Sequence, residues 1–250
     1  MNKYILVTGS NGKIGINIIK YLLKNEYNVI ATFNKNYDKL KVVIKAKKYK
    51  TKLILYQYRQ HDLDENKKLL SFIKKNKLDI IAAINSAAIR PMKKGLNDSF
   101  ANWEKSIKIN SNLNYLFNKN MCEYFKKKGG GKIINIGSIY GVVGPDVNLY
   151  HNENFSLEPD YAYNKFALIG LTKYFASFYG KHKVIVNTIS PGGFEEKQSN
   201  SFKKKYSKKT FVGRMAKYEE INGLIKYLIS EETNYLTGQN LILDGGFTSN

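Results

Sequence analysis

The sequence predicts an α/β fold in which a parallel sheet is covered by helices on both faces. Short apolar runs alternate along the 250 residues with longer segments whose apolar side chains recur at helical spacing. Parallel strands need crossover connections, and this alternation is typical of right-handed β–α–β units. The chain also begins with an apolar run, a glycine-containing break at Gly9-Ser10-Asn11-Gly12 and a helical pattern, which indicates a strand, a turn and a helix.

The expected elements cover most of the chain and form one domain, 1–250, although two small domains would also fit this length. Strands are expected at 4–8, 29–33, 53–58, 79–85, 133–137, 184–189 and 240–243. Helices are expected at 14–23, 37–48, 66–75, within 103–127, at 161–179 and around 218–230. The regions 142–159 and 191–210 have no clear pattern. Both follow strands, at the edge where open α/β sheets place their ligand crevice.

Composition excludes several classes of protein. Hydrophobic residues make up 43% of the chain, which is typical of a globular protein. No run approaches the roughly 18 apolar residues of a membrane span, and no secretory leader precedes the first strand, so we expect a cytoplasmic protein that binds no membrane. The net charge of +21 suggests nucleic acid, but arginine occurs only at Arg59, Arg90 and Arg214. Because base recognition relies on arginine, we expect a solvated basic surface and no nucleic-acid partner.

Cys122 is the single cysteine, and it has neither a disulfide partner nor a cluster of ligands around it in the sequence. We interpret it as a packing residue and expect no metal site.

Tyr161 and Lys165 are the first candidate catalytic residues. They are four positions apart at the start of an expected helix, so they share one helical face. A phenol has a pKa of ~10, and a nearby cation can lower that pKa by roughly 1–3 units. The pair could therefore transfer a proton near neutral pH. Tyr163 points to another face and is the weaker candidate. Alone, such a pair also arises by chance in a chain this rich in tyrosine and lysine.

The glycines of the first turn are Gly9, Gly12 and Gly15. Glycines between a strand and a helix allow a tight turn and a close approach of the backbone to a pyrophosphate. The N-terminus of the helix then supplies free N–H donors and a positive dipole. The turn therefore predicts a phosphate or dinucleotide site, with a plain strand-to-helix turn as the alternative.

Together these motifs make the chain resemble the short-chain dehydrogenase/reductase family from Ile5 to Gly246. Four further segments carry the resemblance: Asn85-Ser86-Ala87-Ala88 after the fourth strand, Ser138 after the fifth, Ser190-Pro191-Gly192 after the sixth, and Thr237 to Gly246 at the last strand. Asn110, in Trp103 to Asn110, matches the fourth catalytic residue of the family. The resemblance implies a doubly wound Rossmann fold with a seven-stranded, mostly parallel sheet.

The resemblance also implies a mechanism. Tyr161 would be the general acid/base, Ser138 would hydrogen-bond the substrate oxygen, and Lys165 would keep Tyr161 acidic and hold the nicotinamide ribose. Asn110 would anchor a water that restores the proton. The residues expected to bind the cofactor are Gly9, Asn11, Gly12, Lys13, Ile14, Gly15, Asn34, Lys35, Asp62, Leu63, Asn85, Ala87, Ala88, Tyr161, Lys165, Pro191, Gly192 and Phe194.

The sequence departs from the family pattern in the cofactor region. Lys13 occupies a position where the compact branch of the family usually has a glycine, and the acidic residue that binds the ribose of NAD is absent after the second strand. Lys13 and Lys35 could meet a 2′-phosphate, so NADP(H) is favoured and NAD(H) is possible. Asp62 matches an adenine-contacting aspartate, although it could equally be a helix N-cap.

The sequence also departs from the pattern around the expected substrate site. The interval between Ser138 and Tyr161 is longer than usual and could bring Tyr150 or His151 to the substrate, although exposed loop positions are the simpler interpretation. Phe194 lies in a segment that often holds a cofactor-binding threonine. A substrate lid is expected at about 193–212. Its lysines, at 203–209, form either a solvated face or a site for a phosphate on the substrate.

The expected activity is NAD(P)-dependent interconversion of a carbonyl and an alcohol on a small molecule. Segments 138–145 and 191–215 are similar to reductases of bacterial surface-sugar pathways of the sialic/legionaminic type, which suits an activated or acidic sugar. The alternatives are a 3-oxoacyl carrier-protein reductase and a non-catalytic NAD(P)-binding regulator. The resemblance also implies a homo-oligomer, a dimer or a tetramer, built through the helices within 103–127 and 166–179.

Overall fold

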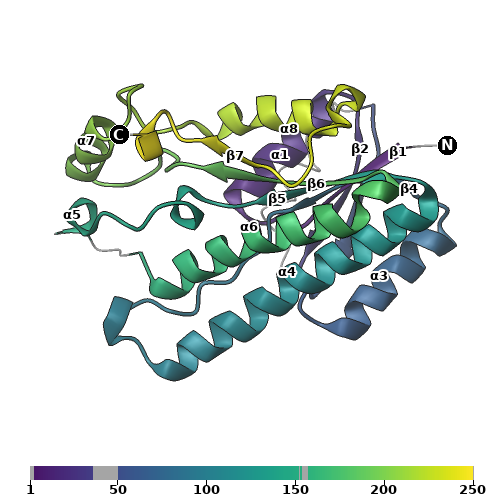
Figure 1. Ribbon diagram of the computed structural model, residues 1–250, viewed down its shortest axis with the longest axis horizontal. Helices are drawn as coiled ribbons and strands as arrows, with labels where there is room; N and C mark the ends of the chain where they lie inside the picture. Colours follow the sequence, from purple (N-terminus) through teal and green to yellow (C-terminus); the bar gives the residue numbers. More distant parts are fainter. Residues whose placement is uncertain (1–2, 36–49, 152, 154–156, 250) are drawn as a thin grey trace.

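Parallel strands form the central sheet of the computed structural model, which describes residues 3–35, 50–151, 153 and 157–249 (Figure 1). Within these residues the sheet has seven strands in the order β3-β2-β1-β4-β5-β6-β7, and every pairing is parallel. The strands are β1 (Lys3–Val7), β2 (Asn28–Phe33), β3 (Leu53–Gln57), β4 (Asp79–Asn85), β5 (Gly131–Ile136), β6 (Val184–Pro191) and β7 (Asn240–Leu243). The predicted seven-stranded Rossmann fold is confirmed.

Helices cover both faces of the sheet (Figure 1). One face carries α1 (Lys13–Lys24) and α8 (Ile221–Ile229); the other carries α3 (Leu63–Lys75), α4 (Phe100–Lys128) and α6 (Pro159–Tyr179). Two shorter helices, α5 (Val147–Tyr150) and α7 (Asn200–Lys208), belong to the regions 142–159 and 191–210. The helix expected at 37–48 lies outside the described residues.

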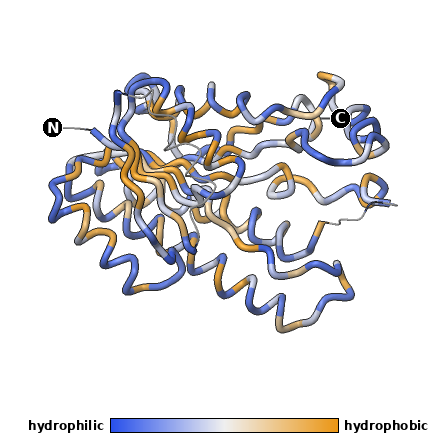
Figure 2. Tube along the Cα trace, turned by 180° about the vertical axis from the view of Figure 1, so that it is seen from behind, coloured by the Kyte–Doolittle hydropathy of each residue, from blue (hydrophilic) through white to orange (hydrophobic). Residues whose placement is uncertain are grey.

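The two helical layers exist because the strands are apolar on both faces. Successive side chains of a strand point to opposite sides, and in β1 Ile5 and Val7 pack with α1 and α8. Tyr4 and Leu6 pack with α3, α4 and α6. Figure 2 shows the resulting band of hydrophobic strands between helices with mixed surfaces. Strands of this kind read as continuous apolar runs, which is why the sequence identifies them.

Helix α7 was not expected, because its run of lysines obscures the helical pattern. Ser199 caps it: the side-chain oxygen accepts a hydrogen bond from the N–H of Phe202 at 3.0 Å. Phe202 and Tyr206, four positions apart, are its buried side chains. A serine cap followed by two aromatic residues at helical spacing was the available signal.

Buried asparagines join β4 and β5 near the carboxyl end of the sheet. Asn85 donates to the side-chain oxygen of Asn135 at 3.1 Å, and its own oxygen accepts from Gln60 at 2.7 Å. Asn135 donates to Asn118 of α4 at 3.0 Å and to Thr172 of α6 at 2.9 Å. Buried polar groups are tolerated when their partners satisfy them, so these bonds hold both helices in register with the sheet.

Replacing Asn135 by alanine should therefore destabilise the protein. The substitution removes hydrogen bonds from buried amide and hydroxyl groups on three elements, β4, α4 and α6, which costs about 3 kcal/mol. The free energy of unfolding, measured by urea denaturation, should fall by that amount, whereas the exposed Asn234→Ala control should change it by less than about 0.5 kcal/mol. An Asn135→Ala protein that unfolds at the wild-type urea concentration would contradict this account.

Candidate active site

A two-part cleft lies at the carboxyl ends of the strands, where a doubly wound sheet places its ligand. The first part is a cavity of about 310 Å³ formed by the turn after β1, the end of β2 and the loops after β3 and β4. The second is a cavity of about 620 Å³ formed around the ends of β5 and β6 by α6, α7 and the loops beside them. Ser86 and Ala88 line both cavities, so the two are neighbouring parts of one cleft.

The glycine turn after β1 forms one wall of the first cavity. Gly9 has a φ of +65°, and a Cβ at this position would lie 2.6 Å from the carbonyl oxygen of Ser86. At Gly15 a Cβ would collide with the carbonyl of Gly9. Gly12 precedes α1 without a side-chain cap, and the first turn of the helix has no acidic residue. The first N–H groups of α1 are thus left for a ligand, which fits a pyrophosphate.

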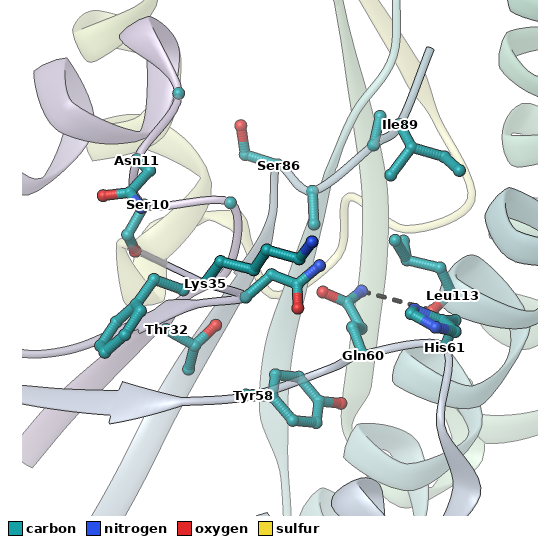
Figure 3. Close-up of a pocket in the computed structure, with 16 residues that line it drawn as sticks. Ser10, Asn11, Thr32, Lys35, Tyr58, Gln60, His61, Ser86, Ile89 and Leu113 are labelled. Atoms are coloured by element: carbon teal, nitrogen blue, oxygen red, sulfur yellow. Dashed lines mark hydrogen bonds between the residues drawn. The ribbon is translucent and has the colours of Figure 1, made fainter. Parts of the chain in front are cut away.

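The rest of the first cavity is shown in Figure 3, where Thr32, Lys35 and Gln60 surround the space together with the glycine turn. Asn34 also lines it, as expected, and none of the described lining residues is an aspartate or a glutamate. The position that would bind the ribose hydroxyls of NAD with an acid is therefore occupied by an amide and a cation.

Two predicted cofactor residues near β3, Asp62 and Leu63, do not line the cavity. Asp62 instead caps α3, because its side chain accepts from the N–H groups of Asp64 at 2.9 Å and Glu65 at 3.2 Å. Gln60 and His61 line the cavity in their place. The N-cap interpretation of Asp62 is therefore the one that its contacts support.

Of the other predicted cofactor residues, most line one of the two cavities. Gly9, Asn11, Gly12, Asn34, Lys35, Ala87 and Ala88 line the first, and Ile14, Ala88, Tyr161, Lys165, Pro191, Gly192 and Phe194 line the second. Lys13, Gly15 and Asn85 line neither. Lys13 forms an ion pair with Glu196, and Asn85 belongs to the buried asparagine cluster.

Three of the four predicted catalytic residues meet in the second cavity. Tyr161 lies in the first turn of α6, and Lys165 follows one turn later with its ammonium group 5.6 Å from the centre of the Tyr161 ring. That ammonium group donates to the carbonyl of Ile136, at the end of β5, at 2.7 Å. Ser138 follows the same strand and lines the cavity. Tyr163, by contrast, is 48% exposed, which agrees with the choice of Tyr161.

Arg90 is a further cation at this site, and the sequence did not indicate it. Its guanidinium carbon lies 4.2 Å from the centre of the Tyr161 ring, in the range of a cation–π contact. It comes from the loop after β4, at the same edge of the sheet as the glycine turn, and lines the second cavity. Its position shortly after a strand end, in a chain with few arginines, was the only signal available.

The two cations set the acidity of Tyr161. Burial alone would raise the pKa of this phenol, but the charges of Lys165 and Arg90 and hydrogen bonding with Ser138 outweigh burial and lower its pKa below ~10. Burial has the opposite effect on Lys165: it lowers the pKa of the ammonium group, while the nearby Tyr161 raises it by a smaller amount. The environment of Tyr161 therefore favours the phenolate. Tyr140 and Tyr150, which line the same cavity, differ from it, because burial raises the pKa of each.

Asn110, the fourth predicted catalytic residue, lies on α4 and is 3% exposed. Its side-chain oxygen accepts from the N–H of Ile89 at 3.0 Å, and its amide donates to the carbonyl of Ile89 at 3.0 Å. These two bonds fix the backbone immediately before Arg90. The expected role of Asn110 as the anchor of a water stays a prediction.

Aromatic residues form the outer wall of the second cavity. Tyr150, from the long interval before α6, lines the cavity and shares a hydrogen bond of 2.8 Å with Tyr140 through their hydroxyls. Helix α7 contributes Phe202 and Tyr206. His151 is exposed and does not line the cavity.

The lysines at 203–209 do not line this cavity either. Among them, Lys203 pairs with Glu195 at 3.0 Å and Lys209 with Asp146 at 2.5 Å. The nearby Lys197 does line the cavity. The cations that line the cavity, among the described residues, are Arg90, Lys165 and Lys197.

A parallel doubly wound sheet, an open glycine turn and a tyrosine near a serine and a lysine are features of an oxidoreductase of the Rossmann type. A family model described as enoyl-(acyl carrier protein) reductase matches residues 9–248. The chain belongs to the short-chain dehydrogenase/reductase family, and it is an oxidoreductase of that family.

Relatives of several kinds match almost the whole chain. Post-translational flagellin modification protein A of Campylobacter coli is 29% identical, with 98% of each chain covered. The 3-oxoacyl-[acyl-carrier-protein] reductase FabG of Aquifex aeolicus is 30% identical over 98% of this chain and 96% of its own. A short-chain dehydrogenase from Leptospira borgpetersenii, solved with bound NAD⁺, is 31% identical with a TM-score of 0.87, covering 99% of this chain and 93% of its own.

None of the helices in the described parts of the chain combines the length and the apolar character that a bilayer crossing requires. Among the same residues, no group of histidine, cysteine or acidic side chains has the arrangement of a metal site.

Proposed function

We propose that this protein interconverts a carbonyl and an alcohol on a small molecule, with Tyr161 as the general acid/base. The observation that carries the proposal is the environment of Tyr161, whose pKa is lowered by Lys165 and Arg90 against the effect of burial. A group with a pKa moved towards neutral pH is suited to proton transfer. A regulator without turnover would not need this arrangement, so we do not favour that alternative.

Each residue of the cleft has a separate role in the proposed reaction. A nicotinamide dinucleotide, when bound, supplies or accepts the hydride. Tyr161 gives a proton to the substrate oxygen during reduction and takes it during oxidation, while Ser138 stabilises the charge on that oxygen through a hydrogen bond. Lys165 keeps the phenol acidic and holds the ribose. The turn at Gly9 and the free N–H groups of α1 bind the pyrophosphate.

Replacing Tyr161 by phenylalanine should abolish turnover and leave the cofactor site intact. We expect kcat to fall by about 10²–10⁴-fold, whereas NADP⁺ or NAD⁺ should still raise the melting temperature of the variant. In the wild type, alcohol oxidation needs the phenolate, so kcat/KM should rise with pH and level off above the lowered pKa of Tyr161.

Turnover is measured with NAD(H) and NADP(H) against nucleotide sugars, sugar acids and a 3-oxoacyl thioester. The exposed Tyr163→Phe variant is the matched control and should keep wild-type activity. Full activity in Tyr161→Phe would refute the assignment. A wild-type protein whose melting temperature responds to neither dinucleotide would refute the proposed function.

NADP(H) is the proposed cofactor, in preference to NAD(H). The support is the first cavity, in which Lys35 and Asn34 follow β2 and no acidic side chain occurs among the described lining residues. A cation there attracts a 2′-phosphate, and an acid would be needed to bind the free ribose hydroxyls of NAD. Lys13 contributes less than expected, because it is paired with Glu196 and lies outside this cavity.

Lys35→Glu should therefore reverse the cofactor preference. Loss of a charge-assisted contact and repulsion of the phosphate should weaken NADPH binding by about 10–100-fold and leave NADH binding unchanged or improved. Lys13→Gln, the matched control, should not alter the ratio of the two dissociation constants. Fluorescence titration with NADPH and NADH measures both, and an unaltered ratio in Lys35→Glu would show that Lys35 does not select the cofactor.

The proposed substrate is an activated or acidic sugar of a surface-sugar pathway, in the cytoplasm. The support is the relative that modifies flagellin, together with Arg90 and Lys197 in the second cavity. A second candidate is a 3-oxoacyl group on an acidic carrier protein. The FabG relative and the net charge of +21 favour it, because a basic surface attracts an acidic carrier.

We also propose a homo-oligomer, a dimer or a tetramer, that forms through α4 and α6. These helices lie side by side (Figure 1) and expose large aromatic side chains: Tyr115, Tyr163, Phe166, Tyr174 and Phe178. Exposed apolar groups gathered on one face are typical of an interface. Light scattering should give a multiple of the 28.7 kDa chain mass, and a monomer at micromolar concentration would contradict this interface.

A further inference from the structure

The three arginines of this chain differ in their partners. Arg59 pairs with Glu65 at 3.5 Å, and Arg214 pairs with Glu220 at 2.6 Å. Arg90 forms no ion pair with any carboxylate in the described part of the chain, and it lies over the ring of Tyr161 instead. A guanidinium group carries a fixed fork of donors that matches a carboxylate. A hydrogen bond to Tyr161 uses part of this fork, and Arg90 lines the second cavity without a carboxylate partner among the described residues.

The charges around Arg90 leave the second cavity positive. Lys165 and Lys197 also line it, and Glu196 is its single acidic residue among those described. Glu196 is already engaged, because it accepts from both Lys13 and the hydroxyl of Tyr218. The cavity thus holds three cations and one carboxylate whose charge is compensated. An anionic group on a ligand would meet no opposing free acid among the described residues.

We propose that Arg90 selects substrates that carry a carboxylate close to the reacting carbonyl. The inference rests on the proposed function and deepens it by naming the residue and the chemical group. The contact with Tyr161 sets the range: an anion held by a guanidinium 4.2 Å from the ring centre lies beside the carbonyl to which that tyrosine donates. Arg90 is thus a specificity-determining residue. Asn110 positions it by fixing the backbone of Ile89.

The same contact couples substrate binding to the proton that is transferred. A carboxylate bound to Arg90 compensates one of the two cations beside Tyr161 and so favours the protonated phenol. Reduction needs this form: the hydride of the reduced cofactor adds to the carbonyl carbon, the carbonyl π bond breaks, and the oxygen takes the phenolic proton. The phenolate then regains a proton from water. The other groups that face Tyr161 are Lys165 and Ser138, with Tyr140 and Tyr150 farther out.

The test compares oxo acids with their own methyl esters, in which a methyl group replaces the negative charge of the carboxylate. Pyruvate, acetoacetate and levulinate are assayed against the three esters with the reduced cofactor. Wild type should prefer an acid over its ester in kcat/KM by about tenfold or more, as expected for a charge-assisted pair. Arg90→Gln should lose this preference through a higher KM, and Arg90→Lys should keep part of it. Lys226→Gln, which removes an exposed charge on α8, should behave as wild type.

A second measurement separates recognition from a merely structural effect. With an ester as substrate, reduction falls as pH rises through the pKa of Tyr161, because the protonated phenol is lost. Removing the positive charge of Arg90 raises that pKa, so the fall should move to higher pH in Arg90→Gln and should not move in Lys226→Gln. An unmoved profile, or an acid preference retained in Arg90→Gln, would overturn the proposal.

If none of the pairs is turned over, binding decides between the two proposals. The melting temperature of the complex with NADP⁺ is measured with each acid and each ester. An acid-specific rise that Arg90→Gln abolishes supports the role of Arg90. A response to NADP⁺ without any acid-specific rise overturns this inference and leaves the proposed function standing. No response to either dinucleotide removes the proposed function itself.

Discussion

The hydrogen bond between Asn85 and Asn135 is the contact on which the arrangement of the site depends. It joins β4 to β5, and each asparagine also binds a second element: Gln60 after β3 on one side, and helices α4 and α6 on the other. Amides buried this deeply must be satisfied, so the strands and helices have one relative position in which all the bonds form. Ser138 lies just after β5 and Tyr161 lies in α6, so the relative position of this strand and this helix brings the two side chains close together.

The electrostatics of the site follow from bringing a phenol and two cations together at the edge of the sheet. Burial opposes charge on Tyr161 and Lys165, and at Tyr161 the attraction between the phenolate and the two cations outweighs it. Backbone groups hold the two cations in place. The carbonyl of Ile136 accepts a hydrogen bond from Lys165, and the amide of Asn110 donates to the carbonyl of Ile89 in the loop that carries Arg90. Two neighbouring loops and one helix thus set the acidity of a single hydroxyl.

Sequence alone predicts the parts of this protein that rest on local rules. The strands are apolar on both faces, the glycine turn has few alternative uses, and Tyr161 and Lys165 share a helical face, so the fold and the centre of the site could be foreseen. The role of Arg90 could not be foreseen from the sequence. Its contact with Tyr161 joins a loop after β4 to a helix about 70 residues later, and only the tertiary structure shows such a contact. Helix α7 had a local signal in its serine cap, but its run of lysines suggested an exposed loop. Asp62 had the signal of a helix cap, but the family pattern suggested contact with the cofactor.

Glu196 joins the start of α1 to the aromatic wall of the second cavity. Its carboxylate accepts from Lys13, next to the glycine turn, and from Tyr218, which stacks on Phe194 with ring centres 4.5 Å apart. Tyr218 and Phe194 line the second cavity, and Lys13 directly follows Gly12, which lines the first. A single carboxylate thus ties the two parts of the cleft together, so a change of its charge would act on both.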